Sequence, residues 1–338
     1  MKKLFPLFAL FILACSNNNS EQIVNMYSQR HYDVDQLQYD NFEKITGIKV
    51  NVIKANADEL IQRMKNEGEN SPADLFITVD VGKLWQASDM DLLQKYNDES
   101  LTDGITESLK DPNGFWVPVT YRSRILVYSN ERVQESDLST YEDLANEKWK
   151  GRICIRSSSN IYNQSLLASM IAHNGENEAE SWAKKVVNNF SRKPKGNDRS
   201  QMTAVVLNEC DITLANTYYL GKWITSDKNT EREYSDKIAV FFPNQKGRGA
   251  HVNISGAAVI KTSKNTSSAI KFIEFLASNK AQKLYSQTNH EYPIRDNIQV
   301  SKIVESWGYP FKKDKLSLNK LGMFNKKAVV IFDKVGWK

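Results

Sequence analysis

Four tyrosines stand in this sequence where an apolar run stops and polar turn residues begin. They are Tyr32 in YSQRHY, Tyr162 in RSSSNIYN, and the adjacent pair Tyr218 and Tyr219 in ANTYYL. We therefore expect each phenol at the end of a secondary-structure element. A phenolate is a hard oxygen ligand, and hard ligands suit small, highly charged cations. If the four phenolates converge, the chemistry that they support best is the binding of Fe(III).

The adjacent pair is the most specific of these signals. Neighbouring side chains of a strand point to opposite faces, whereas at a strand-to-helix turn both can point into one cleft. Tyr162 follows polar residues that suit a helix N-cap, among them Asn160, so we place Tyr162 in the first helical turn. The positive end of that helix would favour a phenolate. The pair Tyr218 and Tyr219 alone would indicate ordinary packing. Only its combination with Tyr32 and Tyr162 indicates a metal site.

Charged and imidazole side chains stand beside these tyrosines. His31 precedes Tyr32, and imidazole also binds iron. We interpret the other histidines, which lie far from the motifs, as structural: His173, His251 and His290. Four phenolates and Fe(III) sum to one negative charge, which needs a cation in a partly desolvated cleft. Arg122, followed by Arg124, is the best candidate for this cation, and Arg30 is a second one. We expect Fe(III) to bind more tightly and Fe(II) to be tolerated.

The first twenty residues are typical of an export signal. A charged start precedes an apolar run from Leu4 to Ala14, which is too short to span a bilayer. The residues before Cys15 also resemble a lipoprotein signal box, in which the cysteine is lipidated. Ordinary cleavage near Ala14 is the alternative. We expect a periplasmic protein, either free or anchored through Cys15.

The composition is that of an ordinary globular protein. Of 338 residues, 41% are hydrophobic and 25% are charged, and the net charge is +5. The length after the signal suffices for two domains with full cores. The positive excess is small and dispersed, which argues against nucleic acid as a partner. Cys154 and Cys210 lie in or beside strand-like runs, and a disulfide and two buried free thiols both remain open.

Strand-like runs alternate with amphipathic helical patterns, as in βαβ units. We expect strands at 23–27, 48–53, 73–78, 151–155, 211–216 and 257–260, and helices at 35–46, 57–67, 162–173, 179–190 and 267–278. Pro118 lies in an extended run, which fits a crossing between lobes, and a return crossing is expected near 243–249. The pattern predicts an α/β clamshell of two lobes. Each lobe would be a mainly parallel sheet flanked by helices, and the crossings would form the hinge.

This pattern divides the chain into five parts. The signal takes 1–20, one lobe takes 21–118 and 246–298, the second lobe takes 119–245, and C-terminal helices at 299–338 lie on the second lobe. Ligands of open α/β sheets bind outside the carboxyl ends of the strands. In a two-lobed protein these ends face one cleft, which closes by hinge bending. The four tyrosines follow strands in this way.

Several stretches together resemble a known family. They are NMYSQRHY at 25–32, GRICIRSSSNIYNQS at 151–165, NTYY at 216–219, GAHVNISG at 249–256 and EYPIR at 291–295. With them the chain resembles, from about Ile23 to its end, the periplasmic ferric-iron-binding proteins of ABC transporters, in particular the cyanobacterial Fut type. The fold implied is the type II, transferrin-like clamshell of periplasmic binding proteins.

The resemblance also implies the site and the partners. Residues matching Tyr32, Tyr162, Tyr218 and Tyr219 bind Fe(III) in that family, and the residue matching His31 is a ligand in some members and not in others. The Fut type usually needs no synergistic anion. The implied role is that of a monomer that carries iron to a permease of the inner membrane.

Two other classes of function compete with this interpretation. A clamshell for a polyamine or an organic anion would want several acids and aromatic walls in its cleft. An iron enzyme often uses two histidines and one carboxylate, and the four histidines of this chain do not form that arrangement. We therefore expect a binding protein and no enzyme.

Overall fold

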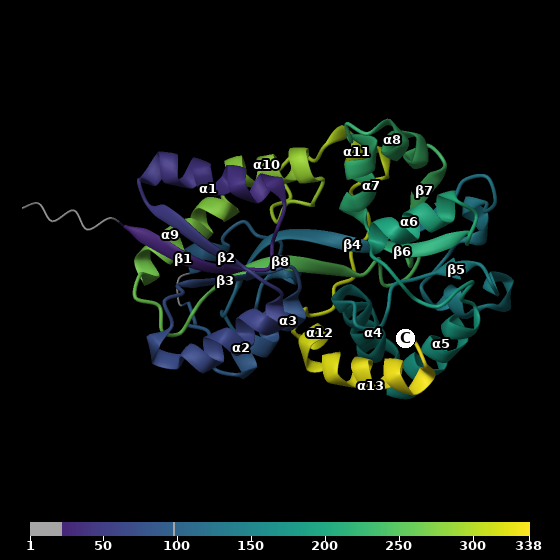
Figure 1. The fold of residues 1–338 in the computed structure, drawn as a ribbon, viewed down its shortest axis with the longest axis horizontal. Helices are drawn as coiled ribbons and strands as arrows, with labels where there is room; N and C mark the ends of the chain where they lie inside the picture. The colour runs from purple at the N-terminus through teal and green to yellow at the C-terminus, as the bar shows by residue number, and fades with distance from the viewer. Residues whose placement is uncertain (1–21, 97–98) are drawn as a thin grey trace, which may run out of the picture.

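Two long antiparallel strands, β4 (Val117–Ser129) and β8 (Val252–Val259), run along the middle of the molecule and join its two halves (Figure 1). This computed structural model describes residues 22–96 and 99–338. The predicted signal peptide and Cys15 lie outside the described residues. All eight strands of the described chain belong to one curled sheet, in the order β2-β1-β3-β8-β4-β6-β5, with β7 also paired to β4.

The first half, to the left in Figure 1, is built on strands from the start of the chain. Strand β1 pairs in parallel with β2 and β3, and β3 pairs antiparallel with β8. The strands of this half are β1 (Ile23–Ser28), β2 (Lys49–Lys54) and β3 (Leu75–Thr78). Its helices are α1 (Asp33–Thr46), α2 (Ala57–Glu67), α3 (Val81–Asp89), α9 (Thr266–Ala277) and α10 (Asn279–Asn289).

The second half uses the far end of β4, which pairs antiparallel with β6 and β7, while β6 pairs in parallel with β5. Its strands are β5 (Ile153–Cys154), β6 (Ile212–Asn216) and β7 (Ile238–Phe241). Its helices are α4 (Ile161–Asn174), α5 (Glu176–Asn188), α6 (Asp198–Val206), α7 (Thr217–Ile224) and α8 (Asn229–Ser235). The chain ends with α11 (Lys302–Ser306), α12 (Asn319–Met323) and α13 (Asn325–Val335).

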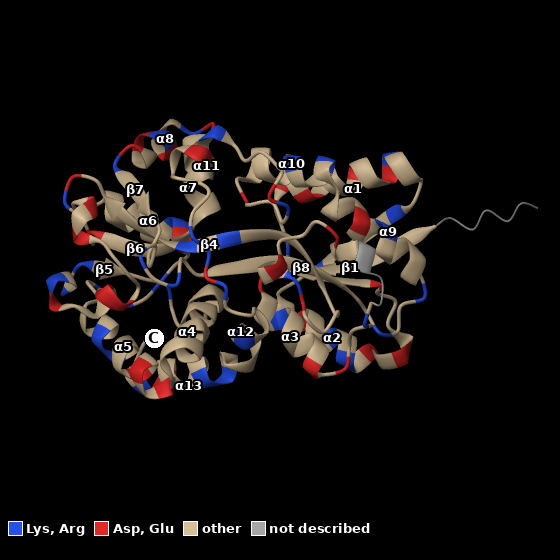
Figure 2. Cartoon of the chain, turned by 180° about the vertical axis from the view of Figure 1, so that it is seen from behind, with Lys and Arg blue, Asp and Glu red and all other residues tan. Residues whose placement is uncertain are grey.

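Short 3₁₀ helices fill several connections. They are η1 (Gly68–Asn70), η2 (Glu99–Thr102), η3 (Glu107–Leu109), η4 (Glu135–Asp137), η5 (Glu142–Ala145) and η6 (Glu147–Trp149). Of the helices in residues 22–96 and 99–338, none combines the length and hydrophobicity that a bilayer crossing needs. Acidic and basic residues are interspersed over both halves (Figure 2).

The α/β class and the two-lobed architecture are confirmed. Parallel pairing is found among β1, β2 and β3 and between β5 and β6, whereas every pair that involves β4 or β8 is antiparallel, so the sheet as a whole is mixed. Both crossing strands continue the sheet. Because β4 leaves the first half and β8 returns to it, the two strands run antiparallel to each other and to most neighbours. Pro118 lies inside β4, beside a register irregularity between Pro118 and Thr120. An irregularity of this kind is where a strand tolerates a proline.

Two apolar clusters hold the fold together. The larger one lies against the central strands and includes aromatic side chains of α1 and α9, such as Phe42 and Phe272. The second one fills the other half around Trp149, Trp182 and Trp337. Helix α13 packs on α4 and α5 and so belongs to this second core. Cys154 and Cys210 form a disulfide with their Cα atoms 5.7 Å apart, which settles the open alternative in favour of the bridge.

Candidate metal centre

All four predicted tyrosines lie at the start of a helix. Tyr32 is the N-cap residue of α1, and Tyr162 is the second residue of α4. Tyr218 and Tyr219 are the second and third residues of α7, directly after β6. Local sequence explains one of these starts, because the side chain of Asn160 caps α4 by accepting a hydrogen bond from the Asn163 amide at 3.2 Å. Three positive helix ends therefore surround the phenols.

The phenol oxygens meet across the two halves of the molecule. Tyr32 donates a hydrogen bond to the oxygen of Tyr218 at 3.0 Å, and the hydroxyls of Tyr162 and Tyr218 lie 3.4 Å apart. The ring of Tyr219 lies against that of Tyr218, with 4.4 Å between their centres. Only 1% of Tyr218 and 8% of Tyr32 and Tyr162 is exposed. The structure thus brings together the four residues that the sequence singled out.

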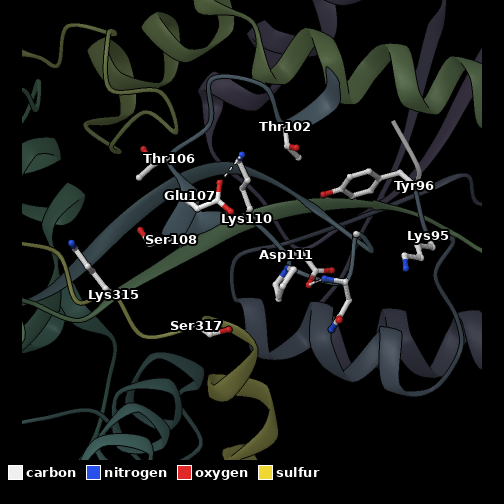
Figure 3. A pocket seen from close by; sticks show the side chains of 13 residues that line it. Lys95, Tyr96, Thr102, Thr106, Glu107, Ser108, Lys110, Asp111, Lys315 and Ser317 are labelled. Carbon is white, nitrogen blue, oxygen red and sulfur yellow. Dashed lines mark hydrogen bonds and ion pairs between the residues drawn. The ribbon is translucent and has the colours of Figure 1, made fainter. Parts of the chain in front are cut away.

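A cavity of about 750 Å³ opens onto Tyr32, Tyr162 and Tyr219. His31 also lines this cavity. The charged residues that line the cavity are mostly basic: Asp33, Lys54, Arg156, Arg199 and Lys222. A second hollow of about 860 Å³ lies between residues 95–96 and 102–114 on one side and the segment that leads into α12 on the other (Figure 3). This second hollow contains none of the predicted ligands, and its Lys110 is paired with Glu107 at 2.8 Å. The tyrosine cavity is therefore the candidate site.

Burial is the main cause that raises the pKa of each of the four phenols above its ordinary value. Negative charge on a neighbouring phenol raises these pKa values further, while Arg122 acts in the opposite direction on Tyr162 and Tyr218. The four phenols are therefore protonated near neutral pH when no cation is bound. A trivalent cation that binds here must displace those protons.

Arg122 and Arg30, the two candidate cations, lie next to the phenols. The guanidinium carbon of Arg122 is 5.5 Å from the centre of the Tyr162 ring, and that of Arg30 is 5.0 Å from the Tyr32 ring. Arg30 is fully paired, with Asp35 and Glu291 both at 2.8 Å. Arg122 is buried and donates to the hydroxyl of Ser255 at 3.1 Å. Its Nε and Nη2 have no hydrogen-bond partner within the described residues.

Two features of the site were missed by the sequence analysis. The first is Lys222, whose ammonium lies 4.2 Å from the centre of the Tyr32 ring. Its position four residues after Tyr218 places it on the same face of α7, and a prediction of that helix would have revealed it. The second is Asp198, a buried carboxylate that pairs with both Arg124 and Arg156 behind Tyr162.

The histidines differ in their surroundings. His31 is exposed, lines the cavity and contacts the Gln29 carbonyl at 3.3 Å, while its ring lies 4.8 Å from that of Tyr32. His251 and His290 are buried away from the cavity lining, and His173 contacts Asp314 at 2.7 Å. Within residues 22–96 and 99–338, no three His, Cys, Asp or Glu side chains cluster as a metal site.

Fold and site together define a two-lobed α/β binding protein with a tyrosine-lined cleft between its halves. The family model of bacterial extracellular solute-binding proteins matches residues 38–310. The chain therefore belongs to this family of bacterial extracellular solute-binding proteins.

Individual relatives are similar over nearly their whole length. Iron uptake protein A1 of Synechocystis is 48% identical over 94% of this chain and 88% of its own. A solved structure of Trichodesmium FutA in complex with iron and citrate ligands has 48% identity and a TM-score of 0.89, over 94% of this chain and all of that one. The ferric binding protein of Campylobacter jejuni has 41% identity and a TM-score of 0.89, over 93% and 100% of the two chains.

Proposed function

We propose that this protein binds ferric iron through the phenolate oxygens of Tyr32, Tyr162, Tyr218 and Tyr219 and carries it to an ABC permease for uptake. The observation that carries this proposal is the meeting of phenol oxygens from both halves of the molecule, 3.0 and 3.4 Å apart. Phenolates are hard ligands that suit Fe(III). The relatives named for iron uptake and ferric iron binding favour iron over a polyamine or an organic anion as the cargo.

The nearby cations support a site that also tolerates Fe(II). Four phenolates and Fe(III) sum to one negative charge, and Fe(II) adds one more. Arg122 is the side chain placed to offset that charge, because two of its nitrogens have no partner among the described residues. Lys222 is a second nearby cation, beside Tyr32. We propose that Fe(III) binds more tightly than Fe(II) in the same cleft.

Four protein oxygens leave room for at least one further ligand of iron. We propose that water or His31 takes this position and that no synergistic anion is needed. The exposed ring of His31 lies at the cavity, beside Tyr32. The relative from Trichodesmium was solved in complex with iron and citrate ligands. Loading this protein with iron with and without citrate therefore tests whether an anion takes part.

We propose that the two halves move about β4 and β8. One lobe would be 21–118 with 246–298, and the other would be 119–245 with the C-terminal helices at 299–338. The packing of α13 on α4 and α5 supports the last assignment, while α12 contacts both α3 and α4. Because the ligands come from both halves, iron should draw the lobes together and reduce the radius of gyration in solution scattering.

The family and the signal-like N-terminus support a periplasmic location. We propose a monomeric carrier without enzymatic activity, which hands its cargo to a permease of the inner membrane. Anchoring through Cys15 remains a proposal, because that residue lies outside the described part of the chain. Mass spectrometry of the protein isolated from cells would reveal a lipid on Cys15.

The proposal is tested by loading iron-free protein with Fe(III). Charge transfer from phenolate to Fe(III) should turn the solution red to orange, and the iron-free protein should be colourless. The four single Tyr→Phe variants should bleach or shift this band. A protein that stays colourless after loading would overturn the proposed ligands. So would a visible band that is the same in the wild type and in all four variants.

A further inference from the structure

Asp80 is a fully buried carboxylate that lies where the two halves of the molecule meet. It follows β3 and is the N-cap residue of α3, where its Oδ1 accepts a hydrogen bond from the Gly82 amide at 2.8 Å. Its Oδ2 accepts two more hydrogen bonds, from the Ser165 hydroxyl at 2.6 Å and from the Asn253 amide at 2.7 Å. Asp80 thus satisfies its buried charge through three donors.

The bond from Ser165 differs from the other two because it joins the halves of the molecule. Asp80 and Gly82 lie in the β3–α3 segment of the first half, and Asn253 lies in the crossing strand β8. Ser165 lies on α4 of the second half, one turn after Tyr162. A movement that opens the cleft between these halves must stretch this hydrogen bond.

Breaking such a bond is costly while the carboxylate stays buried. A buried charge is tolerated only when hydrogen bonds replace the water that it has lost. Burial raises the pKa of Asp80, and the hydrogen bond from Ser165 is the first of the contacts that oppose this shift. The closed arrangement is therefore favoured by a contact that does not involve any phenol.

Two glycines, Gly82 and Gly322, allow α3 to lie close to Asp80 and to α12. A Cβ atom on Gly82 would lie 2.9 Å from Oδ1 of Asp80, so a larger residue there would press on the carboxylate. On the other side, a Cβ atom on Gly322 of α12 would lie 2.4 Å from the Cβ of Trp85 on α3. Two glycines thus let α3 pack tightly against Asp80 and α12.

We propose that the Asp80–Ser165 hydrogen bond is a latch between the halves, which holds the cleft closed on Tyr162 and slows the release of bound iron. Ser165 is in this sense a positioning residue, since it acts through α4 and not on the metal. The effect on release rests on the proposed ligands, whereas the effect on closure does not.

The test compares two serines of the same helix. Ser165→Ala removes the latch, and alanine suits a helix interior. Ser169→Ala is the matched control, because Ser169 lies one turn further on, is equally buried and donates to the Leu166 carbonyl of its own helix at 2.7 Å. Release is measured as the loss of the visible band in an excess of a strong chelator, and closure as the radius of gyration of the iron-free protein.

We expect Ser165→Ala to release iron about tenfold faster than the wild type, the effect of losing one hydrogen bond to a charged group. Its band should keep the wild-type position, its iron-free form should scatter as a more open molecule, and Ser165→Thr should restore slow release. Equal rates in Ser165→Ala and Ser169→Ala would overturn the latch, as would equal scattering of their iron-free forms. A wild-type protein that takes up no iron would instead contradict the ligands, and scattering would still test the latch.

Discussion

The phenol oxygens of Tyr32 and Tyr218 lie 3.0 Å apart, although 186 positions separate the two residues in the chain. Tyr32 stands at the start of α1 in one half, and Tyr218 at the start of α7 in the other. Two neutral phenols can share a hydrogen bond at this distance, whereas two phenolates would repel each other. The pair is therefore stable either when protonated or when both oxygens bind one cation.

Replacing Tyr219 by phenylalanine should remove one iron ligand and leave the packing of the ring almost unchanged. Tyr219 is only partly buried, and its ring would remain against that of Tyr218. We expect Fe(III) affinity to fall by at least about a hundredfold, since even partners that only orient metal ligands cost 10–100-fold. Competition titration and the visible spectrum measure the loss. Tyr96→Phe is the control, because Tyr96 lines the other hollow, and equal affinity in the two variants would contradict the assignment of Tyr219.

Iron affinity should fall steeply in acid. Burial and neighbouring phenols raise the pKa of the four tyrosines, so the iron-free site holds its protons at neutral pH. Binding must then release protons, and each lower pH unit should weaken binding by at least about tenfold. Chelator competition at several pH values gives the slope, and a weakly buffered titration counts the protons. An affinity that stays constant as the pH falls would mean that the phenols remain protonated when iron binds.

Neutralising Arg122 should penalise Fe(II) more than Fe(III). The reduced site carries one more negative charge, and Arg122 is the buried cation with unpartnered nitrogens near Tyr162. Arg122→Met keeps most of the volume of the side chain. Anaerobic competition titrations of both ions would separate the effects, with Arg132→Met as a control, because Arg132 does not line the cavity and pairs with Asp211. Equal losses for both ions, or no loss, would remove Arg122 from this role.

Two buried histidines should make the folded protein lose stability as the pH falls from about 6.5 towards the folded-state pKa values of about 4 for His290 and about 3 for His251. Burial, assisted by Arg124 and Arg248, lowers the pKa of His251 to about 3, and burial with Lys222 lowers that of His290 to about 4. The unfolded chain takes up protons at these histidines near their ordinary pKa of 6.5, while the folded chain does not. Unfolding therefore becomes more favourable as the pH falls through this window.

Urea unfolding of the iron-free protein at about pH 7 and about pH 5 measures this dependence. In His251→Gln, the free energy of unfolding should differ less between the two pH values than it does in the wild type. Glu291 does not interfere between these two pH values. Burial opposes its ionisation, but its ion pair with Arg30 prevails and lowers its pKa to about 2, so its contribution is lost only below its ordinary value of 4.5. A pH dependence that is the same in His251→Gln and in the wild type would show that His251 is not its source.

Local sequence was sufficient to predict where the tyrosines stand, because their positions depend on short-range chemistry. Asn160 favours a helix start through its own side chain, which does not depend on residues distant in the sequence. The apolar run of β6 ends at Asn216, and this local change marks the end of the strand before Tyr218. That these residues bind iron came from their combination and from the resemblance, and it stays a prediction.

Features that depend on packing between distant segments could not be predicted. The direction of β8 relative to β3 and β4 follows from the path of the chain between lobes, so the mixed sheet was missed. Asp80 is a single acidic residue after a strand, and its partner Ser165 lies 85 positions away. Helical spacing places Lys222 on the same face of α7 as Tyr218, but its contact with the Tyr32 ring joins the two halves of the molecule. In each case the feature depends on a contact between segments that are far apart in the sequence, and the local sequence pattern does not say which distant segments meet.

The shared strands β4 and β8 also determine how this protein denatures. Residues 117–123 of β4 pair with β8, and residues 124–128 of the same strand pair with β6. One half cannot melt without exposing the backbone groups of a strand that continues into the other half. Many two-domain proteins lose their domains in separate steps, but here the continuous ladder couples them. The chain should therefore melt as a single cooperative unit, although it opens and closes as two bodies.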